Sequence, residues 1–228
     1  MIIVHHLEHS RSQRVLWLLE ELGLEYEIRY YLRDTQTRLA PPELREVHPL
    51  GKSPVISDGD RTLAESATIV EYLARRYGKG RWAPALKSDA YWDFSYWMHY
   101  AEGSLMPPLL LKLVFDTVGS KAPLLVRPLA RGIAGQVNRA FLDQQIRTHL
   151  DFVESHLAER EWFVGSRISA VDVQMSFPLE AARARGLVGD QRPAINAFVE
   201  RCHQRPAYRR AVDAGGAYDY GPASSSPA

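Results

Sequence analysis

The chain has 228 residues, of which 46% are hydrophobic and 24% charged, and its formal net charge is +1. A chain of this length can form one large domain or two small ones, and its composition excludes collagenous, low-complexity and wholly disordered proteins. The nearly balanced charge excludes a global electric field that would draw the molecule to nucleic acid or anionic lipid.

The single cysteine, Cys202, excludes intramolecular disulfides, four-thiolate zinc sites and Cys-x-x-Cys redox chemistry. The N-terminus lacks a charged segment followed by an apolar stretch, and no apolar run reaches the about 18 residues of a membrane span. We therefore expect a cytoplasmic protein that binds neither nucleic acid nor a membrane.

Strand and helix patterns alternate at the start of the chain. Ile2-Ile3-Val4 is a β-branched run typical of a buried strand. Apolar residues then recur at helical spacing over 12–22, before a stop at Gly23. Residues 26–30 alternate tyrosine or isoleucine with charged residues, the period of a half-buried strand. These patterns predict the order β-α-β.

A second set of patterns completes a small domain over residues 1–77. Residues 33–50 are polar and proline-rich, so they predict a loop with one helical turn near 43–47. Residues 55–63 predict a hairpin around an Asp-Gly-Asp turn, and 67–77 a helix closed by glycine. With a proline before the third strand, β-α-β followed by β-β-α is a thioredoxin-like α/β order.

The rest of the chain reads as a linker followed by helices. Residues 78–87 contain two glycines and a proline and predict the linker, and 88–214 predict an all-helical domain. Its first helical pattern, 88–118, is aromatic-rich and contains Pro107-Pro108, which must kink or break the helix.

Later segments of the helical domain have clearer boundaries. Apolar spacing predicts a helix over 133–158, and further short helices are expected at 193–204 and 206–213. Ser169 and Asp172 stand three residues apart before an apolar run, which is a capping-box arrangement with Asp in place of Glu. Residues 215–228 are rich in Gly, Ala, Ser and Pro, and we expect them to be disordered.

Five segments in this order resemble the cytosolic glutathione transferases, most closely the serine-type bacterial and fungal members. They are 9–14 (HSRSQR), 49–54 (PLGKSP), 63–66 (LAES), 163–165 (FVG) and 205–211 (RPAYRRA). The resemblance covers nearly the whole chain, with two departures: Ser53 stands where valine is more common, and Val171 where alanine is usual. It implies a thioredoxin-like glutathione-binding domain, an all-α C-terminal domain and a homodimer.

The resemblance implies chemistry that depends on the glutathione thiolate, and a serine at the start of the first helix can stabilise that anion. Both Ser10 and Ser12 lie in this window. We favour Ser10 as the catalytic serine, because it stands four residues before Arg14, the offset that serine-type members show. Ser12 is then better placed as an N-cap, although simple capping by both serines is the alternative.

The same resemblance assigns the remaining site residues. Glu65 would hold the γ-glutamyl ammonium, and Ser66 the γ-glutamyl carboxylate at a helix N-terminus. Ser53 would pair with the cysteinyl backbone before a cis Pro54, and Lys52 would hold the glycyl carboxylate. For the hydrophobic electrophile, the candidate pocket residues are Tyr96, His99, Tyr100, Met106 and Leu110, although an aromatic stripe of this kind is also typical of a core.

Other interpretations are less well supported by the residues. His5, His6 and His9 suggest a metal site, but neighbouring positions of an extended chain face opposite sides, so we expect no metal. Glutathione conjugation in detoxification is the predicted function, with glutathione as cosubstrate. Glutathione-dependent peroxidase, isomerase or dehalogenase activity is an alternative on the same scaffold, and a non-catalytic ligand- or protein-binding module is another.

Overall fold

The structure is a computed structural model, which describes residues 1–222. Its sheet consists of β1 (Ile2–Leu7), β2 (Tyr26–Tyr31), β3 (Val55–Asp58) and β4 (Arg61–Ala64), in the order β2-β1-β3-β4. β1 runs parallel to β2 and antiparallel to β3, and β4 is antiparallel to β3. The predicted thioredoxin-like order is confirmed.

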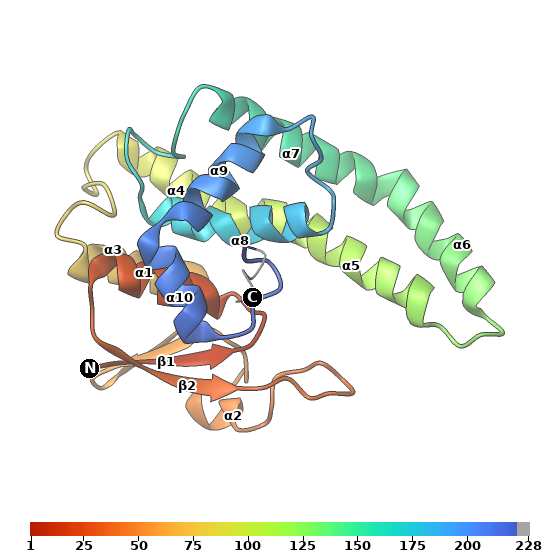
Figure 1. The fold of residues 1–228 in the computed structure, drawn as a ribbon, viewed down its shortest axis with the longest axis horizontal. Helices are drawn as coiled ribbons and strands as arrows, with labels where there is room; N and C mark the ends of the chain where they lie inside the picture. Colours follow the sequence, from red (N-terminus) through yellow and green to blue (C-terminus); the bar gives the residue numbers. More distant parts are fainter. Residues whose placement is uncertain (223–228) are drawn as a thin grey trace, which may run out of the picture.

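Two helices lie between this sheet and the helical half of the molecule (Figure 1). They are α1 (Ser12–Leu22) and α3 (Ser66–Tyr77), whereas the short α2 (Leu44–Val47) lies on the other side of the sheet. α1 contacts the sheet on one side and α8 and α10 on the other. Its side chains from Ser12 to Leu19 are therefore all buried.

The second half is entirely helical, as predicted. Its elements are α4 (Ala90–Tyr100), the π-helical segment η1 (Ala101–Leu105), α5 (Met106–Lys121), α6 (Arg127–Val137), a second π-helical segment η2 (Asn138–Leu142), α7 (Asp143–Ala158), α8 (Ala170–Ala184), α9 (Pro193–Gln204) and α10 (Pro206–Gly215). No helix among residues 1–222 combines the length and apolar character needed to cross a membrane.

The predicted interruption near Pro107-Pro108 takes the form of a π-helical segment. η1 precedes α5, and both prolines fall in the first turn of α5. Leu105 and Met106 keep right-handed helical φ/ψ angles and the Met106 N–H still donates to the Ala101 carbonyl, so the helix continues through a wider π-helical turn.

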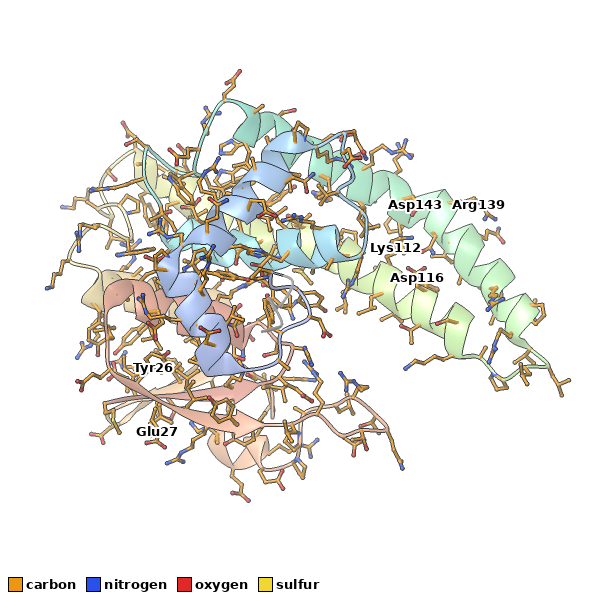
Figure 2. The ribbon with its side chains drawn as sticks, in the orientation of Figure 1. Tyr26, Glu27, Lys112, Asp116, Arg139 and Asp143 are labelled. Carbon is orange, nitrogen blue, oxygen red and sulfur yellow. The ribbon has the colours of Figure 1, made fainter. Side chains whose placement is uncertain are left out.

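α5 and α6 form a hairpin that projects from the body of the molecule (Figure 1). Polar contacts hold its base together, where Lys112 Nζ lies 3.1 Å from Asp143 and Asn138 donates to Asp116 Oδ1 at 2.8 Å. Figure 2 places Lys112 and Asp116 on α5, facing the rod of α6 and α7 that carries Asp143.

α8 is the central helix, and the predicted capping box starts it. The Asp172 carboxylate accepts the Ser169 N–H at 2.7 Å and the Phe163 N–H at 2.8 Å, and the Ser169 hydroxyl also donates to it. Asp172 is fully buried, and residues 170–182 of the helix are buried on all sides. The cap therefore anchors both the helix and the loop before it.

The expectation of a disordered tail does not hold for residues 215–222. Tyr218 donates a hydrogen bond to the buried Glu180 carboxylate of α8 at 2.6 Å, and Tyr220 packs edge-on against Phe177. Two aromatic rings supply apolar area that the small residues around them lack. The remaining part of the expected tail, 223–228, lies outside the described residues.

Replacing Asp172 with alanine should lower the free energy of unfolding by about 2–4 kcal/mol, because it removes the cap and leaves buried N–H groups without an acceptor. Urea denaturation followed by circular dichroism measures the change. Asp213→Ala, at an exposed position of α10, is the control and should shift stability by less than about 0.5 kcal/mol. Equal effects of the two substitutions would contradict the anchoring role.

Candidate functional site

The turn between β1 and α1 brings a serine hydroxyl to the surface of a cleft. His9 has a positive φ of 48°, which turns the chain sharply before the helix. Ser10 Oγ accepts the Ser12 N–H at 3.2 Å and lies 2.8 Å from Ser12 Oγ. Since a hydroxyl hydrogen can rotate, Ser10 can also donate to a ligand in the cleft.

Ser12 takes a different role from the N-cap expected of it. Its hydroxyl donates to the Leu7 carbonyl at 3.2 Å, accepts the Leu7 N–H at 3.3 Å and lies 2.9 Å from His6 Nδ1. Burial lowers the pKa of His6 to about 4, so this histidine is neutral at neutral pH. Ser12 is completely buried and fixes the turn, whereas Ser10 faces the cleft.

The cleft has a volume of about 490 Å³ and lies between the α/β half and the helical half. Five predicted residues line it together: Ser10, Lys52, Ser53, Met106 and Leu110. The other lining residues are Leu7, His9, Arg11, Arg33, Arg38, Leu39, Ala40, Leu113, Phe177, Arg185, Asp219 and Tyr220.

The segment before β3 has the predicted cis peptide bond between Ser53 and Pro54. The Ser53 hydroxyl donates to the His5 carbonyl at 2.9 Å, which ties this loop to β1. Gly51 has φ +56°, a left-handed conformation that favours glycine at this turn. The loop presents Lys52 and Ser53 to the cleft.

Glu65 and Ser66 lie at the start of α3, outside the lining of the cleft. Glu65 has φ 69° and ψ 115°, a conformation that costs a non-glycine residue about 1–3 kcal/mol and persists where the surroundings impose it. The buried Ser66 hydroxyl accepts a hydrogen bond from Arg14 at 3.0 Å. Arg14 thus connects the start of α3 with α1.

A partly buried ion-pair cluster lies behind the cleft. Arg14 is completely enclosed and donates to Glu102 Oε1 at 2.6 Å, while Arg11 Nε lies 3.0 Å from Glu102 Oε2. Burial alone would raise the pKa of Glu102, but the charges and hydrogen bonds of the two arginines outweigh it and lower the pKa. Both guanidinium groups also lie 5.1 Å from the centre of the Phe177 ring.

Three predicted pocket residues do not line this cleft. Tyr96, His99 and Tyr100 line a separate shallow hollow with Trp92 and His149. They lie on the part of α4 that faces α7, where the Tyr100 hydroxyl lies 2.7 Å from His149 Nδ1. Their helix continues through η1 before it reaches Met106, so only the later residues of the pattern face Ser10.

Several residues that line the cleft or lie behind it were not predicted from the sequence. Arg11 stands next to Ser10 in the HSRSQR segment, and Glu102 is a carboxylate in an otherwise aromatic and apolar stretch. The sequence could therefore have indicated both as candidate site residues. Phe177 looked like an ordinary core residue of α8. No sequence motif marked Arg185 or Tyr220 as a site residue, because only the packing of the C-terminal segment brings them to the cleft.

The three N-terminal histidines occupy separate environments. His5 Nδ1 lies 3.0 Å from the Tyr31 hydroxyl, whereas His6 contacts Ser12 on the other side of β1. His9 Nδ1 lies 3.3 Å from Asp219. Within residues 1–222 no three His, Cys, Asp or Glu side chains are grouped as metal ligands.

The arrangement can stabilise an anion beside an apolar surface. Ser10 offers a hydroxyl at the N-terminal end of α1, where the helix dipole also favours negative charge. Met106, Leu110 and Phe177 form an apolar wall on the opposite, helical side of the cleft. A nucleophilic anion next to Ser10 could therefore meet an apolar second molecule in the same cleft.

Two family models match the chain, the glutathione S-transferase N-terminal domain over residues 10–76 and the C-terminal domain over residues 139–206. The chain is 36% identical to glutathione S-transferase 3 of Schizosaccharomyces pombe, covering 93% of this chain and 87% of that protein. It is also 36% identical to glutathione S-transferase 1 of Saccharomyces cerevisiae, covering 91% and 92%.

A solved glutathione S-transferase from Actinobacillus pleuropneumoniae is similar over almost the whole chain. It superimposes with a TM-score of 0.80 at 33% identity, covering 96% of this chain and 95% of that one.

Replacing Glu102 with glutamine should lower the free energy of unfolding by about 1.5–3 kcal/mol at neutral pH, because it leaves the buried Arg14 without its counter-charge. The folded-state pKa of Glu102 is lowered, so its contribution is present above the ordinary pKa of 4.5 and is lost as pH falls through the folded value. The difference between the two proteins should therefore shrink below about pH 4.5.

Denaturation midpoints at several pH values test this expectation. Glu27→Gln is the matched control, because it breaks an exposed ion pair with Arg29 and should cost less than about 0.5 kcal/mol. A constant difference across the acid range would mean that the charge of Glu102 is not the stabilising feature.

Proposed function

This chain belongs to the cytosolic glutathione S-transferase family and is a glutathione transferase enzyme; on that basis we propose that it conjugates the glutathione thiolate to a hydrophobic electrophile. We further propose that Ser10 is the catalytic residue that stabilises the thiolate, as in serine-type members. The observation that carries the proposal is the position of the Ser10 hydroxyl, in the cleft and at the start of α1.

The energies involved are sufficient for this role. A thiol with a pKa of about 8.5 is only a few per cent ionised at neutral pH, and lowering that pKa by two units takes about 2.7 kcal/mol. A hydroxyl hydrogen bond to a charged acceptor contributes roughly 1.5–3 kcal/mol, and a helix N-terminus roughly 0.3–1 kcal/mol. Ser10 and α1 together can therefore supply the shift.

The rest of glutathione would extend from Ser10 along the α/β domain. Glu65 would hold the γ-glutamyl ammonium and Ser66 its carboxylate, and the strained backbone of Glu65 supports a binding role. Ser53, preceding Pro54, would pair with the cysteinyl backbone, and Lys52 would hold the glycyl carboxylate. Arg14 supports this arrangement by fixing Ser66 relative to α1.

The electrophile would lie against the helical side of the cleft. Met106, Leu110 and Phe177 supply its apolar wall. The thiolate sulfur attacks the electrophilic carbon, a C–S bond forms, and the leaving group departs with the electron pair of the bond that breaks. We place peroxidase, isomerase and dehalogenase chemistry second, because it would use the same thiolate with a different pocket.

The same proposal extends to organisation and location. We propose a glutathione-binding domain at 1–77, a linker at 78–87 and a helical domain at 88–214, in a cytoplasmic homodimer. Family membership supports the dimer, and the exposed rings of Trp92 and Tyr96 on α4 offer an apolar surface for a second copy.

Ser10→Ala should return the pKa of the bound glutathione thiol towards about 8.5 and lower kcat/KM for an aryl halide by about 10- to 100-fold. Both effects are expected because the substitution removes the hydroxyl that donates to the thiolate. The helix N-terminus remains and still stabilises part of the negative charge. Thiolate absorbance of bound glutathione, titrated against pH, measures the first effect directly.

Ser155→Ala is the control for Ser10→Ala, since this exposed serine of α7 lies outside the cleft and should change neither quantity. If the wild-type protein binds glutathione without lowering its thiol pKa, the conjugating function is wrong and a non-catalytic binding module takes its place.

Glu65→Gln should weaken glutathione binding by about fivefold, because the exposed carboxylate loses its charge but keeps its shape. Isothermal titration calorimetry measures the dissociation constant, and the pKa of the bound thiol should stay as in the wild type. Asp60→Asn, in the exposed β3–β4 turn of the same domain, should leave binding unchanged. If Glu65→Gln binds glutathione as tightly as the wild type does, Glu65 is not part of the glutathione-binding site.

A further inference from the structure

The cleft carries more positive charge than its own carboxylates can balance. Five of its lining side chains are Arg or Lys, namely Arg11, Arg33, Arg38, Lys52 and Arg185, whereas Asp219 is its single acidic side chain among the described residues. The cleft is therefore suited to ligands with net negative charge.

Some of this charge is already accounted for. Arg11 pairs with Glu102, and Lys52 belongs to the loop proposed to bind glutathione. Arg33 is held by backbone carbonyl groups of Glu8 and Arg38, on the α/β side of the cleft. Arg185 is different, because it comes from the C-terminal end of α8, on the helical side.

Arg185 has no carboxylate partner within residues 1–222. Its guanidinium donates to the Leu109 carbonyl at 3.4 Å and to the Tyr220 hydroxyl at 3.3 Å, both neutral acceptors. The side chain is half-buried, so its charge is only partly screened by water. A planar guanidinium in this state favours a carboxylate ligand.

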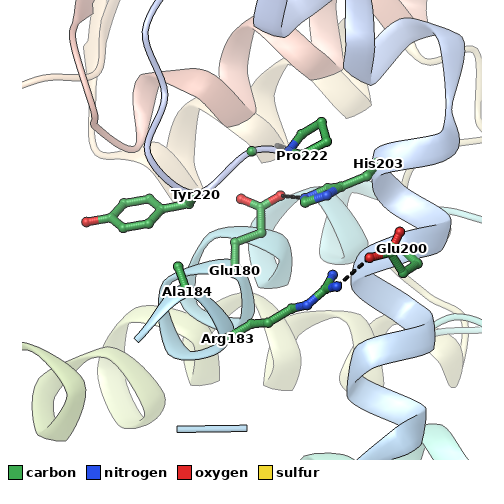
Figure 3. Close-up of a pocket in the computed structure, with 8 residues that line it drawn as sticks. Glu180, Arg183, Ala184, Glu200, His203, Tyr220 and Pro222 are labelled. Atoms are coloured by element: carbon green, nitrogen blue, oxygen red, sulfur yellow. Dashed lines mark hydrogen bonds and ion pairs between the residues drawn. The ribbon is translucent and has the colours of Figure 1, made fainter. Parts of the chain in front are cut away.

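The C-terminal segment holds a second donor beside Arg185. Tyr218 donates a hydrogen bond to Glu180, and the Asp219 N–H donates to His9 Nδ1 at 3.2 Å, so two anchored residues directly precede Tyr220. In Figure 3 the segment crosses Glu180 of α8, with Tyr220 and Pro222 on either side of it. The Tyr220 hydroxyl accepts from Arg185 and keeps its own hydrogen for a ligand.

These donors adjoin the apolar wall where the electrophile would lie. Met106, Leu110, Leu113 and Phe177 line the same cleft as Arg185 and Tyr220. A molecule with an apolar body against this wall would bring a terminal carboxylate to the guanidinium. Glutathione, held from the α/β side by Lys52 and Ser53, would leave Arg185 to the second substrate.

We propose that the second substrate is an electrophile with an apolar body and a carboxylate, which Arg185 and the Tyr220 hydroxyl bind. This inference rests on the proposed glutathione conjugation and names the substrate class. For an aryl chloride, the thiolate sulfur forms a C–S bond to the ring carbon, the C–Cl bond breaks, and chloride leaves with the electron pair. The carboxylate takes no part in the bond changes and serves only for recognition.

A matched pair of electrophiles tests the proposal, chlorodinitrobenzoate and its neutral methyl ester. Each kcat/KM is divided by the uncatalysed rate with free glutathione, which removes the difference in intrinsic reactivity. The wild type should prefer the acid by about tenfold, and Arg185→Gln should lower the acid-to-ester ratio by about tenfold. Arg185→Lys should retain part of the preference, because it keeps the charge but not the planar fork.

Arg183→Gln is the matched control on the same helix. Arg183 pairs with Glu200 of α9, as Figure 3 shows, and is not among the residues that line the cleft. This variant should keep the wild-type acid-to-ester ratio. Equal ratios in the wild type and Arg185→Gln, with both electrophiles turned over, would overturn the carboxylate proposal and leave the conjugating function intact.

Binding measurements separate failure of recognition from failure of catalysis. The glutathione conjugates of the acid and of the ester are prepared chemically, and their dissociation constants are measured by calorimetry. The acid conjugate should bind about tenfold more tightly to the wild type and lose that advantage in Arg185→Gln, even if turnover is absent. If Arg185→Gln instead weakens glutathione itself as much as the acid conjugate, Arg185 binds a glutathione carboxylate and the proposal is wrong.

Discussion

The position of the cleft depends on one buried charge, the guanidinium of Arg14. α1 contributes this residue, and burial makes an unpaired charge there too costly to keep. Glu102 from the helical half and Ser66 from α3 supply its partners, so three elements meet at one side chain. The two halves of the molecule are thereby held in the register that forms the cleft.

The turn just before the same helix places Ser10 in that cleft. The sharp turn at His9 and the fully buried Ser12 fix the start of α1 against β1, so the Ser10 hydroxyl is held by local geometry. The sheet side thus contributes a fixed polar group and the helical side an apolar wall. This arrangement suits a reaction between a nucleophilic anion and an apolar molecule. The α/β half would hold the anion, and the helical half would hold the apolar molecule.

The C-terminal segment adds a third contribution that neither half supplies. Tyr218 is fastened to Glu180, a buried carboxylate that also accepts hydrogen bonds from His203 and Tyr208. Glu180 therefore joins α8, α9 and α10 to the segment, as part of Figure 3 shows. Tyr220 therefore lies beside Arg185 in the lining of the cleft and gives it a polar boundary.

By itself, the sequence determined the order of the elements and the capping box at Ser169 and Asp172, because these follow from local periodicity and capping. The grouping of Ser10, Lys52 and Ser53 was implied by the resemblance of short segments to the glutathione transferases. The tertiary structure alone decided which serine faces the cleft, and it separated Tyr96, His99 and Tyr100 from Met106 and Leu110. It also placed Arg185 and Tyr220 at the cleft and ordered residues 215–222. The physical reason is that such contacts join residues far apart in the chain, and their energy arises only when burial brings them together.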